Sequence, residues 1–72
     1  MTRAQSFTLF GVVLLELEPD GGSRRFEAQF NGQSFLLTVD ANEIATHGVT
    51  EALKQAVYEL KQGRRGTLFP RP

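Results

Sequence analysis

The sequence predicts an α+β fold: a three-stranded antiparallel β-meander followed by one C-terminal amphipathic helix that packs on one face of the sheet. Two observations predict it. The first half of the chain holds three apolar or alternating segments separated by glycine-containing turns, and the second half carries apolar residues at helical spacing. A chain of 72 residues suffices for one hydrophobic core, so we expect a single domain at 7–63. Residues 1–6 are then an N-terminal extension and 64–72 a basic C-terminal tail.

Three strands are expected, at 7–18, 24–30 and 33–40. The first is rich in β-branched and aromatic residues and ends at the proline and glycine turn of 19–22. The other two are joined by Asn31-Gly32, a residue pair typical of a type I′ hairpin turn because both positions tolerate a positive φ. Three consecutive strands with short turns predict the meander.

The two turns also fix which residues lie opposite one another. In both hairpins the resulting register brings apolar side chains of one strand against apolar side chains of the next, so turn chemistry and hydrophobic pattern agree. The expected pairs are Ala28 with Phe35, Phe26 with Leu37, Leu15 with Phe26 and Val13 with Ala28.

Helical signals begin at Asp40. Asp40 and Glu43 have the spacing of a capping box, which predicts a short helical turn ended by Gly48. Thr50 is the expected N-cap of the main helix, and Gly63 suits the left-handed residue after its C-terminus. The apolar stripe of this helix consists of Ala52, Leu53, Ala56, Val57 and Leu60.

The segment EIATHGVTEAL resembles the helix-turn-helix of DNA-binding proteins, and that resemblance implies a recognition helix. Two departures count against it. Only two residues separate Ala45 from Gly48 where the motif has three, which rotates the first helix by about 100° relative to the turn. Lys54 occupies a packing position that the motif fills with an apolar residue, and burying an unpaired lysine is costly. We therefore expect a capped turn that leads into an amphipathic helix.

The first predicted strand is apolar on both faces, although one helix can cover only one of them. Large apolar side chains on an uncovered face indicate a protein contact. The predicted partner-binding residues are Phe10, Val12, Leu14 and Leu36. The partner would be a second copy in a homodimer, or a larger protein for which this chain is a regulator or small subunit. Alternatively, Leu68 and Phe69 fold back over this face.

The charge balance argues against nucleic acid as the main partner. Eight lysines and arginines balance eight acidic residues, and the sheet face away from the helix is expected to carry more carboxylates than guanidinium groups. Only the cationic C-terminal segment fits phosphates, so weak nucleic-acid binding is the alternative function. Its candidate contacts are Lys61, Arg64, Arg65 and Arg71.

No motif indicates catalysis, a cofactor or a small-molecule substrate. The chain has no cysteine, and its single histidine, His47, shares a helical face with Glu43, which gives two ligands where a zinc site needs more. We expect a non-enzymatic protein without metal or cofactor. The apolar run at 7–15 is too short to span a membrane and lacks a cleavage signal, so we expect a cytoplasmic protein with no membrane partner.

Overall fold

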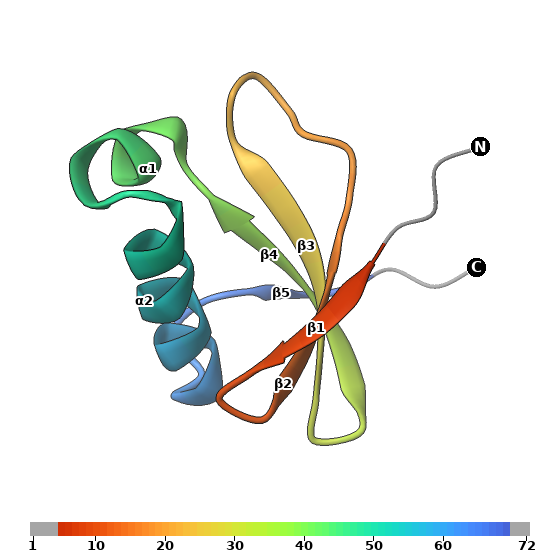
Figure 1. The fold of residues 1–72 in the computed structure, drawn as a ribbon. Coiled ribbons are helices and arrows are strands. Elements are labelled where there is room, and N and C mark those ends of the chain that lie inside the picture. The colour runs from red at the N-terminus through yellow and green to blue at the C-terminus, as the bar shows by residue number, and fades with distance from the viewer. Residues whose placement is uncertain (1–4, 70–72) are drawn as a thin grey trace.

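The protein is a five-stranded antiparallel sheet with two helices on one side of it, as a computed structural model of residues 5–69 describes (Figure 1). The strands lie side by side in the order β1-β2-β3-β4-β5. The expected α+β class holds, but the expected three-stranded meander with a single helix is wrong. The elements are β1 (Ser6–Leu9), β2 (Val12–Glu16), β3 (Arg24–Phe30), β4 (Gln33–Val39), α1 (Ala41–His47), α2 (Val49–Lys61) and β5 (Thr67–Leu68).

The expected first strand is two strands joined by a tight turn. Phe10 and Gly11 have φ values of 52° and 80°, which is the backbone of a type I′ turn, and Leu9 lies opposite Val12 across the hairpin. The prediction fails here because phenylalanine is not among the residues that normally indicate such a turn, and the surrounding run is uniformly apolar.

Strand β2 pairs with β3 one residue away from the expected register. Leu14 lies opposite Ala28, where the pattern places Val13. Because side chains alternate between the faces of a sheet, this shift exchanges the two faces of the strand. Val12 and Leu14 are fully buried in the core, whereas Val13 is 36% exposed. The expectation that Val12 and Leu14 lie on an uncovered face is therefore wrong.

The shift arises in the connection between β2 and β3. Residues 21–22 both have positive φ and form a second tight turn, and the flanking Asp20 and Ser23 exchange both backbone hydrogen bonds at 3.0 Å. The next described pair is Glu16 with Phe26. One side of the hairpin therefore holds an extra residue between the two pairs, which the sequence pattern does not reveal.

The hairpin of β3 and β4 has the expected register. Asn31 and Gly32 have φ values of 57° and 77°, so the asparagine-glycine turn forms as expected. The pairs Ala28 with Phe35 and Phe26 with Leu37 are both confirmed.

Helix α1 begins after Asp40, whose backbone N–H donates to the Glu43 carboxylate at 3.0 Å, as a capping box requires. Gly48 ends α1, as expected, and also serves as the N-cap of α2. Its carbonyl oxygen accepts the Ala52 N–H at 3.0 Å. The expectation of Thr50 as N-cap is therefore wrong, because the two helices share one cap residue.

Helix α2 ends as the sequence predicts. Gly63 has a φ of 75°, and its N–H donates to the Leu60 carbonyl at 3.0 Å. The Arg64 N–H donates to the Glu59 carbonyl at the same distance, which completes a Schellman motif. This cap turns the chain back toward the sheet.

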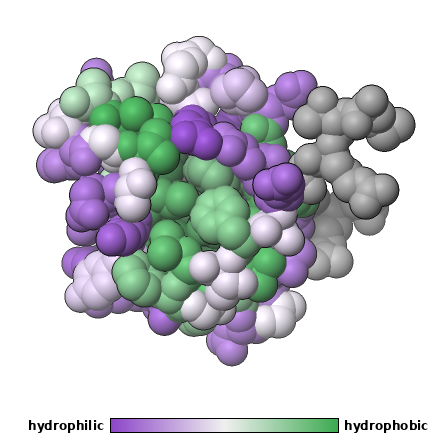
Figure 2. Space-filling view, viewed as in Figure 1, coloured by the Kyte–Doolittle hydropathy of each residue, from purple (hydrophilic) through white to green (hydrophobic). Residues whose placement is uncertain are grey.

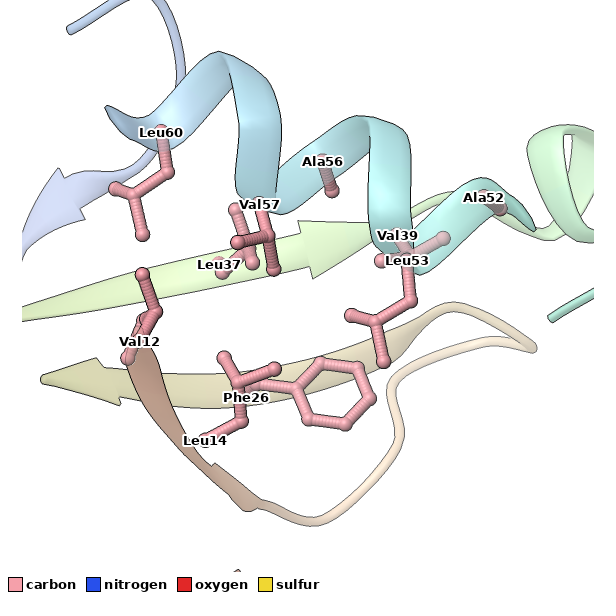
Figure 3. Packing of buried hydrophobic residues seen from close by; sticks show 11 residues of the cluster. Val12, Leu14, Phe26, Leu37, Val39, Ala52, Leu53, Ala56, Val57 and Leu60 are labelled. Carbon is pink, nitrogen blue, oxygen red and sulfur yellow. The ribbon is translucent and has the colours of Figure 1, made fainter. Parts of the chain in front are cut away.

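The core lies between α2 and the strands. The expected helical stripe is buried against β2, β3 and β4, and the side chains of helix and strands point toward one another (Figure 3). Each large side chain buried in this way contributes about 1.5–3 kcal/mol. The strand residues of the core are Val12, Leu14, Phe26, Ala28, Leu37 and Val39.

The final strand comes from the segment expected to be a tail. Leu68 lies opposite Phe35 on β4, and the Phe69 N–H donates to the Ser34 carbonyl at 2.8 Å. Leu68 and Phe69 therefore extend the edge of the sheet and do not fold back over Val12 and Leu14, which are core residues.

Candidate protein-interaction surface

Strand β1 forms one edge of the sheet, and within residues 5–69 no other strand pairs with its outer side. Its sequence, Ser-Phe-Thr-Leu, contains no charged residue and no proline. Natural proteins usually protect an edge strand with lysine, proline or a bulge, because its unpaired backbone groups accept another strand. None of these protections is present in β1.

The aromatic ring of Phe7 adds an apolar side chain to this edge. Phe7 lies opposite Leu14, which places it on the same side of the sheet as the helices. Its ring packs edge-to-face on Phe26, with 6.3 Å between centroids and 89° between planes, yet it remains 42% exposed. Figure 2 shows hydrophobic side chains gathered in the middle of this face, between α2 and the strands in front.

Phe10 extends the apolar surface at the end of the hairpin. It is 51% exposed, although its φ of 52° is a left-handed conformation that bulky residues rarely adopt. An open depression of about 510 Å³ lies beside it, lined by Phe10, Tyr58, Lys61 and Gln62. The hairpin tip and the last turns of α2 thus share one shallow, mainly apolar hollow.

Lys61, in the last turn of α2, contacts the tip of the β1–β2 hairpin. Its Nζ donates to the Phe10 carbonyl oxygen at 2.7 Å and lies 6.0 Å from the centre of the Phe30 ring. A cation over an aromatic face is attracted by the ring electrons. The side chain therefore contacts the turn while remaining exposed to solvent.

The four expected partner-binding residues do not share one surface. Phe10 is exposed in the turn, Val12 and Leu14 are buried, and Leu36 is half-buried on the sheet face away from the helices. The edge surface depends instead on Phe7, which is not among the predicted partner-binding residues. A glycine inside the apolar run, Gly11, is the one signal that could have revealed the turn.

The cationic residues of the C-terminal segment are also dispersed. Arg65 donates to the Glu43 carboxylate at 2.6 Å and to Glu59 at 3.1 Å, and these contacts are only partly exposed. The Arg65 guanidinium lowers the pKa of Glu43 by hydrogen bonding to it, and the carboxylates raise the pKa of Arg65. Arg64 donates to the Gln62 side chain, and Arg71 lies outside the described residues.

No protein family, curated protein or solved structure matches this chain. Residues 5–69 contain no group of three or more histidine, cysteine, aspartate and glutamate side chains placed to bind a metal ion. Neither helix of this part of the chain is long and apolar enough to cross a membrane.

Proposed function

We propose that this protein is a small, non-enzymatic protein-interaction module that binds its partner through the β1 edge and the apolar surface beside it. The partner adds a strand to β1, so backbone hydrogen bonds contribute affinity and the exposed aromatic side chains contribute specificity. The cytoplasm is the compartment we propose, in keeping with a chain that has no cysteine.

The conformation of Phe10 is the observation that carries this proposal. A bulky side chain at positive φ costs about 1–2 kcal/mol, and asparagine or glycine would avoid that cost. Phe10 gains little from burial, since half of it is exposed. Strain retained at an exposed aromatic residue supports a role in binding, because strained positions cluster at functional sites.

Nucleic-acid binding is less well supported by the geometry. Arg65 is already neutralised by Glu43 and Glu59, and Lys61 is engaged by the hairpin. Phosphate affinity depends on cations that are free to replace condensed counterions.

A site-specific photo-crosslinker tests the proposal. The crosslinking residue replaces Thr8 on the outer edge of β1 or, as a matched control, Thr46, an exposed residue of α1. In cells that naturally make the protein, we expect a protein adduct from position 8 and none from position 46. Equal yields, or no adduct from position 8, would overturn the proposal.

A further inference from the structure

The outward-facing backbone groups of β1 follow from its turn. Residues that flank a two-residue type I′ turn form a hydrogen-bonded pair, as Asp20 and Ser23 do in this protein, and such pairs alternate along an antiparallel hairpin. In the β1–β2 hairpin, Leu9 lies next to the turn. The N–H and C=O groups of Leu9 and Phe7 therefore point toward β2, and those of Ser6 and Thr8 point toward the open edge.

The absence of charge along this edge allows it to pair with a second copy of itself. A two-fold axis brings each residue near its own copy, so any charge close to the axis meets a like charge. Residues 5–11, Gln-Ser-Phe-Thr-Leu-Phe-Gly, carry no charged side chain. A second copy of the chain can approach this strand without electrostatic repulsion along its length.

We propose that the occupant is a second copy of this chain, whose β1 pairs antiparallel with β1 so that Phe7 lies opposite Phe7 of the second copy. This proposal rests on the function proposed above and names its partner. In this register Ser6 and Thr8 of one copy lie opposite Thr8 and Ser6 of the other. All outward-facing groups of the strand then exchange hydrogen bonds across the dimer.

The two Phe7 rings occupy the position between those hydrogen-bonded pairs, where opposing side chains approach most closely. Both rings lie on the helix side of their own sheets, because Phe7 lies opposite Leu14 in each copy. The joined sheet is therefore continuous, and the helices of both copies lie on the same side of it. Aromatic side chains that face each other across strands stabilise such pairing.

Single cysteines test the register, since the natural chain contains none. In this arrangement the Cα atoms at position 7 lie about 4.5 Å apart, within the range that a disulfide bridges. Position 6 of one copy lies opposite position 8 of the other. The Cα atoms of two residues at position 6, or of two at position 8, are therefore too far apart for a disulfide. Under mild oxidation we expect Phe7→Cys to form a disulfide dimer, and Ser6→Cys and Thr8→Cys to remain largely monomeric. Preferential crosslinking of Thr8→Cys would overturn the register.

Sedimentation keeps the proposal testable if Phe7→Cys does not fold. The 8.0 kDa chain should sediment at twice that mass in the micromolar range. Thr8→Pro removes an N–H that points to the open edge, where proline is tolerated, and should raise the dimer dissociation constant about tenfold or more. Thr8→Ala keeps the N–H and should leave the dimer dissociation constant unchanged. A wild type that stays monomeric overturns self-pairing; an adduct from position 8 with another protein would then leave the function proposed above intact.

Discussion

Arg65 lies at the edge of β4 with its Nη2 atom 2.8 Å from the carbonyl oxygen of Thr38. Strand β5 has only two residues, so this side chain satisfies a backbone acceptor that the strand does not reach. The same guanidinium bridges Glu43 of α1 and Glu59 of α2. One side chain thus connects the sheet edge to both helices.

Replacing Arg65 with methionine should lower the free energy of unfolding by about 1–3 kcal/mol, because Glu43 and Glu59 each lose one of their hydrogen-bond donors and the Thr38 carbonyl loses its contact with the guanidinium. Arg64→Met is the matched control. Arg64 is exposed, so its loss should change stability by about 0.5 kcal/mol or less. Urea unfolding of both variants measures the difference, and equal effects would contradict the role assigned to Arg65.

Stability should also fall in acid. Hydrogen bonds from Arg65 lower the pKa of Glu43, and those from Gln55 and Arg65 lower the pKa of Glu59. A carboxyl group with a lowered pKa in the folded state stabilises the fold above its unfolded pKa, about 4.3. That contribution is lost as the pH falls through the folded pKa. Denaturation from about pH 6 to pH 2.5 should show this decline, and Arg65→Met should show a shallower one.

Neighbouring residues of β2 test which face is buried. Val12→Lys places a charge in the core, where the residue is 0% exposed, and should unfold the protein or cost at least about 3 kcal/mol. Val13→Lys, at a position 36% exposed, should cost about 1 kcal/mol or less. Circular dichroism melts of the two variants would contradict the observed register if their order were reversed.

Val12 and Val13 also show why part of the fold could not be predicted from the sequence. Asparagine-glycine has strong local turn preference, so the β3–β4 register was predictable, and the helical stripe of α2 follows from its spacing. The extra residue between β2 and β3 leaves no such mark, because Val12 and Val13 are equally apolar. Strand β5 is too short for an alternating pattern and depends on tertiary contacts. At the surface, Phe10 is exposed, but it lies in a turn and not on the face of a strand, and Phe7 was not among the predicted partner-binding residues.

The turns Phe10-Gly11 and Asn31-Gly32 have the same type I′ backbone. Exchanging their first residues therefore measures the strain at Phe10. Phe10→Asn should raise the free energy of unfolding by about 0.5–1.5 kcal/mol, since asparagine tolerates positive φ. It should also weaken partner binding if the exposed ring makes contact. The reciprocal change Asn31→Phe, at a φ of 57°, should destabilise the protein by a similar amount. Thermal melts of both variants provide the comparison, and a destabilised Phe10→Asn would indicate that the ring stabilises the monomer.

Gly66 is a second position where the backbone and packing constrain the residue. Its φ is 93°, and a Cβ atom there would lie 2.7 Å from Leu60 Cδ1 in the core. Gly32 has a similar φ of 77° but open space around it. Gly32→Ala should therefore cost about 1 kcal/mol, and Gly66→Ala about 1–3 kcal/mol more. Hydrogen exchange should show that Gly66→Ala also releases the Phe69 N–H from Ser34.

The order of strands in the sheet determines which strands are expected to pair early during folding and which late. Because β1 to β4 are joined by two-residue or short turns, these pairings close small loops, which favours rapid formation. Pairing of β5 with β4 closes a much larger loop that contains both helices. We therefore expect β5 to dock last. Until it docks, the seven-residue β4 is the second edge of the sheet in place of the two-residue β5. A folding chain therefore briefly presents a longer open strand edge and is most susceptible to aggregation at that stage.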